Sequence, residues 1–172
     1  MNIENKLIDE KQLEDKVREM ALKIDKAYDG EEFIMIVVLK GASVFASDLL
    51  KNITGDVYLD FMAVSSYGMS TQSSGTVKIL KDLDMEIENK NILIVEDIID
   101  TGLTLHYLSQ NLLSRKPKSL KICTLLDKPQ KRKCEVKADF VGFEVPDKFI
   151  VGYGIDCKEK YRNLPYISLV EA

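Results

Sequence analysis

Apolar residues gather in short unbroken runs along the chain, and these runs predict strands. Phe33 to Leu39 and Asn91 to Val95 are apolar without alternation and rich in branched side chains, which is typical of strands covered on both faces. Val57 to Val64 and Leu120 to Leu126 are predicted as further strands. Between the strands, apolar residues recur every three or four positions, which is typical of amphipathic helices.

Three segments carry this helical period. The first spans Asp9 to Gly30, and Asp9 with Gln12 resembles a capping box at its start. The second spans Ser43 to Lys51, with Ser43 as a candidate cap. The third starts near Thr104 or Leu105. Because such helices alternate with apolar strands, we predict an α/β fold with a central, mainly parallel, twisted sheet flanked by helices.

The longest polar stretch, Ser65 to Thr76, is followed by a segment that can return as a strand, Val77 to Leu83. We therefore expect a long hairpin whose tip is a lid or a loop. Farther along, Ala138 to Val145 and Phe149 to Ile155 are short strand-like pieces, and one more apolar segment closes the chain. No repeat, low-complexity tract or linker divides the sequence, so we expect a single domain over residues 1–172.

The length and composition fit one globular domain. The 172 residues are 45% hydrophobic and 30% charged, and a chain of this size needs no disulfide or structural metal. Its three cysteines form no C-x-x-C pair and it has one histidine, so we expect reduced thiols and no zinc site. The net charge of −4 argues against nucleic-acid and anionic-membrane partners, and we see neither a secretory signal nor an apolar run long enough for a bilayer. We therefore expect a cytoplasmic protein.

Charged residues follow four of the strand-like runs. These are Lys40-Gly41, Glu96-Asp97, Asp127-Lys128 and Asp156. An open parallel sheet binds its ligands outside the carboxyl ends of its strands, and those ends meet at one edge. The sequence therefore predicts a cleft of mixed charge at that edge.

The run that begins at Asn91 leads into the stretch with the richest chemistry. Glu96 and Asp97 end the run, and carboxylates there can accept hydrogen bonds from sugar hydroxyls or bind a divalent cation. Asp100 follows as a candidate general acid or base. Thr101-Gly102-Leu103-Thr104 then enters the third helix, where unpaired N–H groups, a glycine and two hydroxyls suit a phosphate. The plainer interpretation is an ordinary strand end with Asp100 as a helix cap.

The segment Val95-Glu96-Asp97-Ile98-Ile99-Asp100-Thr101-Gly102 resembles the phosphoribosyl-pyrophosphate motif of the type I phosphoribosyltransferases. The resemblance covers nearly the whole chain and narrows to the hypoxanthine (hypoxanthine-guanine) phosphoribosyltransferases. The other matching segments are Leu39-Lys40-Gly41 for the pyrophosphate loop, Ser66-Tyr67 for the lid, Leu125-Leu126-Asp127-Lys128 for the purine-reading lysine, residues 139–153 for the purine pocket, and Asp156 with Tyr161-Arg162 for the metal and pyrophosphate.

The resemblance implies a purine-salvage enzyme that transfers the phosphoribosyl group of phosphoribosyl pyrophosphate to N9 of a 6-oxopurine, hypoxanthine or guanine, with Mg²⁺. It implies that Asp100 is the catalytic residue that takes the N7 proton, that Lys128 donates to the 6-oxo group and that Phe149 stacks on the purine. The implied residues are Lys40, Gly41, Glu96, Asp97, Asp100, Thr101, Gly102, Leu103, Thr104 and Arg162 for phosphoribosyl pyrophosphate, Lys128, Phe149, Ile150 and Asp156 for the purine, and Glu96, Asp97 and Asp156 for the metal.

The resemblance also implies how the domain is divided. We expect a core of about residues 1–126, a flexible hairpin lid at residues 65–77 that carries Ser66 and Tyr67, and a small C-terminal hood of about residues 127–172 over the purine. A cis peptide bond before Lys40 and a homodimer or homotetramer are further expectations of the family.

Two other classes of protein fit part of the pattern. A non-catalytic relative that senses nucleotides and binds RNA or DNA would tend to lose catalytic residues or gain a basic face, whereas the expected catalytic residues are present here and the net charge is −4. A response-regulator-like switch would explain the acidic strand ends but not the Thr-Gly-x-Thr cradle or the aromatic pocket. The basic run of Lys128, Lys131, Arg132 and Lys133 fits a solvated turn better than a binding patch.

Overall fold

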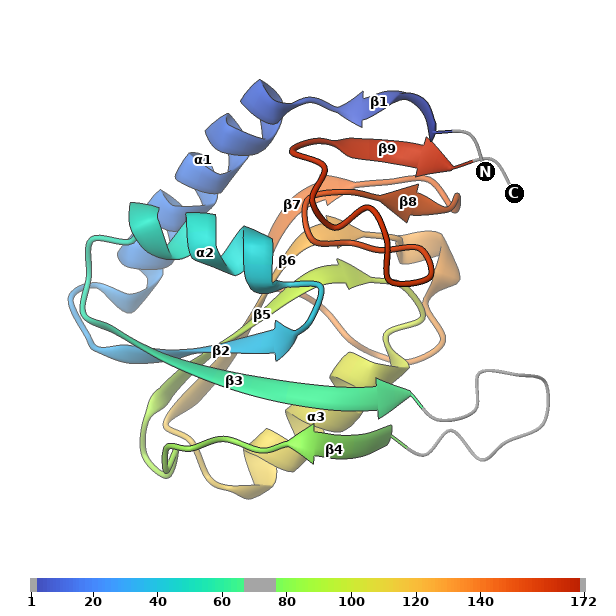
Figure 1. Ribbon diagram of the computed structural model, residues 1–172. Helices are drawn as coiled ribbons and strands as arrows, with labels where there is room; N and C mark the ends of the chain where they lie inside the picture. Colours follow the sequence, from blue (N-terminus) through green and yellow to red (C-terminus); the bar gives the residue numbers. More distant parts are fainter. Residues whose placement is uncertain (1–2, 67–76, 171–172) are drawn as a thin grey trace.

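The structure is a computed structural model that describes residues 3–66 and 77–170. Its largest element is a six-stranded sheet in the order β4-β3-β2-β5-β6-β7 (Figure 1). Five strands are parallel to one another, and the sixth, β4, pairs antiparallel with β3. The strands are β2 (Phe33–Leu39), β3 (Val57–Ser66), β4 (Val77–Lys81), β5 (Asn91–Ile99), β6 (Ser119–Asp127) and β7 (Phe140–Glu144). The predicted α/β fold with a mainly parallel sheet is confirmed.

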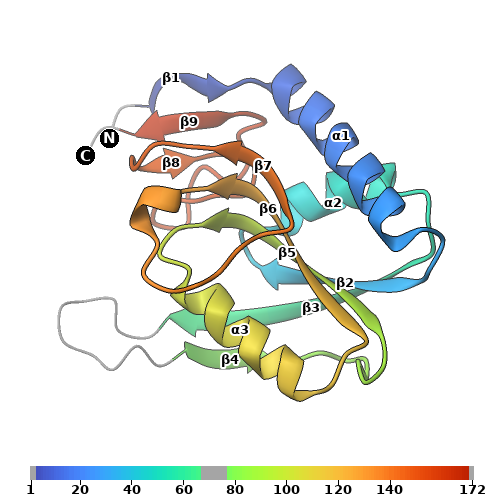
Figure 2. The ribbon, with the colours of Figure 1, turned by 180° about the vertical axis from the view of Figure 1, so that it is seen from behind.

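Helices cover both faces of this sheet. α1 (Glu10–Tyr28) and α2 (Ser43–Asn52) lie on one face, and α3 (Leu103–Ser114) lies on the other (Figure 1, Figure 2). Alternate residues of β2 enter the two apolar cores that result, with Met35 in one and Ile36 in the other. A strand with core on both faces has no polar side, which explains the unbroken apolar run.

The observed starts of the helices agree in part with those predicted from the sequence. Asp9 caps α1 in a capping box, because its carboxylate accepts from the Gln12 N–H at 2.8 Å and the Gln12 side chain accepts from the Asp9 N–H at 2.9 Å. The expected cap of α2 was wrong. Ala42 is the N-cap residue, and the Ser43 hydroxyl donates to the Lys40 carbonyl at 2.7 Å. Ser43 therefore stabilises the loop after β2 and does not cap the N-terminus of α2.

A second, three-stranded antiparallel sheet stands beside the carboxyl ends of β5 and β6 (Figure 1). It consists of β1 (Ile3–Ile8), β9 (Ile167–Val170) and β8 (Ile150–Val151). The sequence analysis missed β1, whose pairing partner lies at the other end of the chain. The strand expected from Phe149 to Ile155 is shorter because the three residues after β8 all have positive φ, which ends the extended backbone.

The predicted hairpin is present at the edge of the main sheet. Ser66, the last residue of β3, pairs with Val77, the first residue of β4. The tip at residues 67–76, including the lid residue Tyr67, lies outside the described residues. In the described part of the chain, no helix has both the length and the apolar character needed to cross a bilayer.

Candidate active site

The predicted site segments meet at the carboxyl edge of the main sheet. Lys40 follows β2, Asp100 follows β5 and Lys128 follows β6. The segment between β8 and β9 touches the same edge, because a Cβ placed on Gly154 would lie 2.2 Å from the Gly41 carbonyl oxygen. The ends of β2, β5 and β6 therefore meet at one edge, as predicted. The prediction that Asp156 ends a fourth strand of the same sheet was wrong, because β8 ends at Val151 and belongs to the separate antiparallel sheet.

The loop after β2 lies directly against the acidic end of β5. The peptide bond between Leu39 and Lys40 is cis, which confirms the expectation from the family. A Cβ placed on Gly41 would lie 1.7 Å from Oδ2 of Asp97 and 2.6 Å from its Cγ. Residue 41 must therefore be glycine for Asp97 to hold its position, a requirement that comes from close approach.

Glu96 and Asp97 belong to β5 itself, which continues to Ile99. The Glu96 side chain is buried, at 9% exposure. Burial, and then the charge of Asp97, raise the pKa of Glu96 well above its ordinary value. Burial also raises the pKa of Asp97, whereas hydrogen bonds from Glu96 and from the Ile98 N–H, the latter at 2.7 Å, act in the opposite direction. The pair therefore holds a proton more tightly than two exposed carboxyl groups would.

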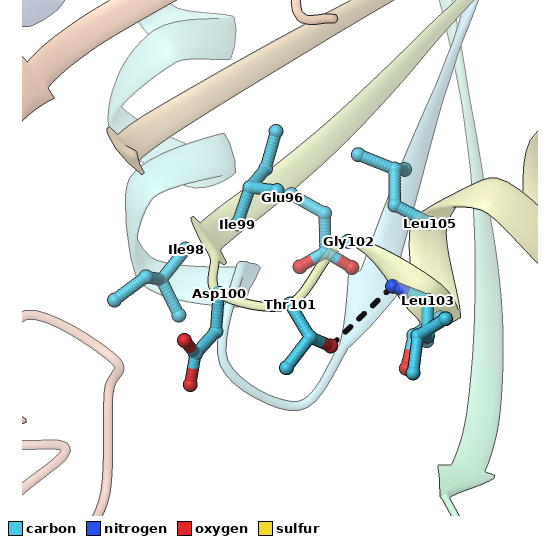
Figure 3. A pocket seen from close by; sticks show the side chains of 9 residues that line it. Glu96, Ile98, Ile99, Asp100, Thr101, Gly102, Leu103 and Leu105 are labelled. Carbon is cyan, nitrogen blue, oxygen red and sulfur yellow. Dashed lines mark hydrogen bonds between the residues drawn. The ribbon is translucent and has the colours of Figure 1, made fainter. Parts of the chain in front are cut away.

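The loop between β5 and α3 lines a cavity of about 210 Å³. Figure 3 shows Glu96 pointing to this loop and Asp100 and Thr101 projecting from it. Gly102 begins α3 at a φ of 83° without any side-chain cap, so the interpretation of Asp100 as a helix cap was wrong. The first N–H groups of α3 are available for an anion, apart from that of Leu103, which donates to Thr101 Oγ1 at 3.4 Å.

One side-chain oxygen of the loop has no partner. Oδ1 of Asp100 is buried and has no hydrogen bond within the described residues. The other carboxylate oxygen, Oδ2, lies 3.7 Å from the Lys131 ammonium, which also pairs with Asp147 at 2.9 Å. A buried carboxylate oxygen without a donor suits a ligand that brings its own proton.

The basic run after β6 is only in part the solvated turn that was expected, since Lys133 is exposed but Lys128 and Arg132 are not. Lys128 is only 6% exposed, and its ammonium donates to the Lys148 carbonyl at 2.8 Å. The Arg132 side chain is 18% exposed and pairs with the Asp127 carboxylate. The prediction failed because the partners of both cations lie on other segments or across a turn. Charge composition alone does not reveal such partners.

Two of the purine residues that the family resemblance implies, Phe149 and Ile150, follow the segment that Lys128 contacts, whereas Asp156 pairs with Arg162. Phe149 follows the carbonyl that Lys128 contacts, and its ring is 70% exposed, whereas Ile150 beside it is buried. Burial lowers the pKa of Lys128, and the nearby Asp100 carboxylate acts the other way. An open aromatic face next to an amine suits a flat heterocycle that carries a hydrogen-bond acceptor.

The two predicted pyrophosphate cations already have partners. Nη2 of Arg162 lies 2.9 Å from the Asp156 carboxylate, and its Nε is buried with no acceptor in residues 3–66 and 77–170. Lys40 pairs with Glu159 at 3.0 Å, and both side chains are mostly exposed. The sequence analysis missed Glu159. The only signal for it is its place within the motif that holds Asp156 and Arg162.

The three carboxylates predicted to hold a metal do not form a closed metal site. Within the described residues, no group of three or more histidine, cysteine and acidic side chains is arranged to hold an ion. Magnesium usually keeps several waters and takes one or two protein carboxylates together with substrate phosphates. The partly exposed Asp156 fits an ion that arrives with a phosphorylated ligand, and the buried pair Glu96 and Asp97 fits less well.

Comparison with known proteins gives a consistent result. The family described as "Phosphoribosyl transferase domain" matches residues 5–158. Hypoxanthine-guanine phosphoribosyltransferase of Bacillus subtilis (strain 168) is 55% identical over 170 residues, which cover 99% of this chain and 94% of that protein. The enzyme of the same name from Aquifex aeolicus (strain VF5) is 52% identical over 166 residues, which cover 96% and 93%.

Solved structures agree at the level of the backbone. A crystal structure of a hypoxanthine-guanine phosphoribosyltransferase from Bacillus anthracis, with a HEPES molecule in its active site, superposes with a TM-score of 0.95. The two chains are 56% identical, and the aligned part covers 99% of this chain and 100% of the Bacillus anthracis chain.

Proposed function

The chain belongs to the phosphoribosyltransferase family, and from this membership we propose that it transfers the phosphoribosyl group of phosphoribosyl pyrophosphate to N9 of hypoxanthine or guanine in purine salvage. One observation carries the proposal. The Asp100 carboxyl group belongs to the loop between β5 and α3 that lines the cavity, called the phosphate loop below, and it also lies near the Lys128 ammonium, which contacts the carbonyl before Phe149. A sugar phosphate and a flat base can then meet at one proton-accepting group.

The sugar phosphate takes the β5 side of the site. The N–H groups and hydroxyls of Thr101 to Thr104 bind the 5′-phosphate, with Gly102 allowing its close approach. Glu96 and Asp97 accept hydrogen bonds from the ribose hydroxyls. Their raised pKa values support this role, because a buried acid pair gains from donors that a ligand supplies.

The base takes the side of the C-terminal sheet. It stacks on Phe149, its edge is read by the Ile150 backbone and by Asp156, and Lys128 donates to the 6-oxo group. Adenine has an amino group at the 6-position, which would face a donor with a donor. This mismatch selects 6-oxopurines.

Asp100 is the catalytic residue of the proposed reaction. Its partnerless Oδ1 takes the N7 proton as N9 attacks C1′ and pyrophosphate leaves. Positive charge develops on the ribose in the transition state, and the nearby Glu96 and Asp97 stabilise it. Lid closure by Ser66 and Tyr67 keeps water from the activated sugar.

Pyrophosphate leaves between the loop after β2 and the C-terminal segment. Lys40, the Gly41 backbone and Arg162 bind it, and the planar fork of the arginine suits its paired oxygens. Asp156 would hold a magnesium ion, which would supply charge neutralisation of the leaving group. Ligand binding thus replaces the bonds from Lys40 to Glu159 and from Arg162 to Asp156.

We also propose the division into a core of about residues 1–126 with a lid at 65–77 and a hood of about residues 127–172. The hood, built on β8 and β9, carries the base-reading residues. A homodimer or homotetramer follows from the family.

The test is formation of inosine monophosphate from hypoxanthine and phosphoribosyl pyrophosphate by purified protein. We expect turnover with Mg²⁺, none after chelation, and little with adenine. Measuring kcat/KM for hypoxanthine, guanine and xanthine then ranks the bases. A folded protein that turns over none of the three would contradict the proposal and favour a nucleotide-sensing relative.

A further inference from the structure

The turn after β6, residues 128–133, donates hydrogen bonds to backbone carbonyl groups of the phosphate loop. Three successive carbonyl groups, that of Ile99 at the end of β5 and those of Asp100 and Thr101 in the loop, accept hydrogen bonds from this turn. The donors are the Lys128 N–H at 2.9 Å, Nη1 of Arg132 at 3.0 Å and the Lys133 N–H at 2.9 Å, in that order. The loop's carbonyl oxygens therefore point to the turn, which leaves N–H groups and hydroxyls for the cavity.

This arrangement has an electrostatic consequence. A carbonyl oxygen that faced the cavity would repel a bound phosphate, whereas an N–H group attracts it. Two of the three donors are backbone groups that any sequence could supply. The side chains of two residues also donate, Arg132 to the Asp100 carbonyl and Cys134 Sγ to the Thr101 carbonyl at 3.8 Å. Of these, Arg132 acts on the residue that also carries the catalytic carboxylate.

Arg132 is itself firmly held. Its other terminal nitrogen, Nη2, pairs with the carboxylate of Asp127, and the two side chains are 18% and 14% exposed. Its Cδ packs against the loop, because a Cβ placed on Gly102 would lie 2.9 Å from it. A planar fork can donate to a carboxylate and a carbonyl at once, and a lysine ammonium in its place lacks that geometry.

We propose that Arg132 is a positioning residue that fixes the Asp100 carbonyl away from the 5′-phosphate and so sets both phosphate affinity and the placement of the Asp100 carboxylate. The proposal rests on the function proposed above. It assigns to this arginine a role that its place in the basic run does not indicate.

The test compares ligands with and without a 5′-phosphate. In Arg132→Ala we expect inosine monophosphate to bind about 10- to 100-fold more weakly and kcat to fall by a similar factor, because a misplaced loop affects both. Pyrophosphate affinity should change by less than about threefold, since Lys40 and Arg162 lie outside the turn. Calorimetric titration measures both affinities.

Two variants separate positioning from folding. Arg115→Ala removes a similar arginine–aspartate pair, to Asp82 at 2.9 Å, at the opposite end of α3. It should lose stability without any loss of inosine monophosphate affinity. Arg132→Lys keeps the charge but should behave like Arg132→Ala. Guanidinium added at low concentration should restore activity to Arg132→Ala and should not restore it to Arg132→Lys.

The outcomes are distinct. Equal loss of affinity for inosine monophosphate and pyrophosphate, full activity of Arg132→Lys, or unchanged binding by Arg132→Ala would each overturn the assignment of Arg132. Wild-type protein that binds inosine monophosphate but does not form it would contradict the proposed function instead, and the binding comparison would still decide the role of Arg132.

Discussion

Replacing Gly41 by alanine tests the contact between the pyrophosphate loop and the acid pair. The new Cβ would lie 1.7 Å from Oδ2 of Asp97. The carboxylate cannot simply turn away, because its Oδ1 accepts from the Ile98 N–H at 2.7 Å. One of the two groups must therefore move by roughly 1.7 Å to restore an ordinary contact.

The magnitude follows from that displacement. Misplacing a substrate-positioning group by about 1 Å can cost about 100-fold in rate, and overpacking a close-packed contact costs about 1–3 kcal/mol. We therefore expect Gly41→Ala to lower kcat/KM for phosphoribosyl pyrophosphate by about 100-fold and to lower the Tm by several degrees. Initial rates at saturating hypoxanthine and differential scanning calorimetry measure the two effects.

Two variants make this prediction specific. Gly55→Ala is the matched control, because its Cβ would lie at an ordinary 3.4 Å from the Asp25 carboxylate, and it should change neither quantity appreciably. Adding Asp97→Ala to Gly41→Ala removes the clash, so the Tm should recover while activity does not. If Gly41→Ala alone kept activity within about twofold of wild type, the close approach would not matter and the reasoning would be refuted.

Three further predictions concern single side chains. Asp100→Ala should lower kcat far more than it weakens phosphoribosyl-pyrophosphate binding, and equal losses would show a loop-shaping role instead. The raised pKa of Glu96 means that the folded state binds its proton more tightly than the unfolded state, so this group costs stability as pH rises above the ordinary value of 4.5. In metal-free buffer, Glu96→Gln should therefore have a higher Tm than wild type at pH 7 and a similar Tm at pH 4. It should also bind phosphoribosyl pyrophosphate more weakly. A difference in Tm between variant and wild type that is the same at both pH values would contradict this. Phe149→Ala should raise KM for hypoxanthine about tenfold, because the ring is proposed to stack on the purine. The Tm should not change, because Phe149 is 70% exposed. A fall in Tm of several degrees would show that the ring is structural.

The sequence predicted best what depends on neighbours in the chain. The apolar run of β2 indicated a strand with core on both faces, and Asp9 with Gln12 indicated the start of α1. The order of acid, glycine and hydroxyls from Glu96 to Thr104 indicated a loop between a strand and a helix, which the structure has, and the anion site expected there stays a prediction. Each signal lies within about ten residues, which is the range over which periodicity and capping act.

Such local signals do not reveal contacts between segments that are distant in the sequence. β1 pairs with β9 across nearly the whole chain, so its short sequence carries no hint of a partner. Arg132 could not be distinguished from a solvated cation until its contact with the Asp100 carbonyl was known. For the same reason, the pattern marked Gly41 as a loop residue but did not show that Asp97 requires it.

Three cations of the predicted site are paired with carboxylates in the unliganded protein. Lys40 pairs with Glu159, Arg162 with Asp156, and Lys131 with Asp147. If the proposed function holds, we expect pyrophosphate to bind by exchange, in which a phosphate oxygen replaces a carboxylate as the partner of Lys40 or Arg162, so that no new cation has to be buried.

Two buried atoms of the predicted site residues have no such partner. Among the described residues, four buried side-chain atoms lack any hydrogen-bond partner: Oδ1 of Asp100, Nε of Arg162 and the hydroxyl oxygens of Ser65 and Ser109. The first two belong to the predicted site. Such atoms cost free energy in the unliganded protein, and a ligand that satisfies them recovers it on binding. One atom needs a proton and the other needs an anionic oxygen. The proposed reaction brings a proton to Asp100 on the purine and an oxygen to Arg162 on pyrophosphate, so the two unsatisfied atoms correspond to the base and to the leaving group.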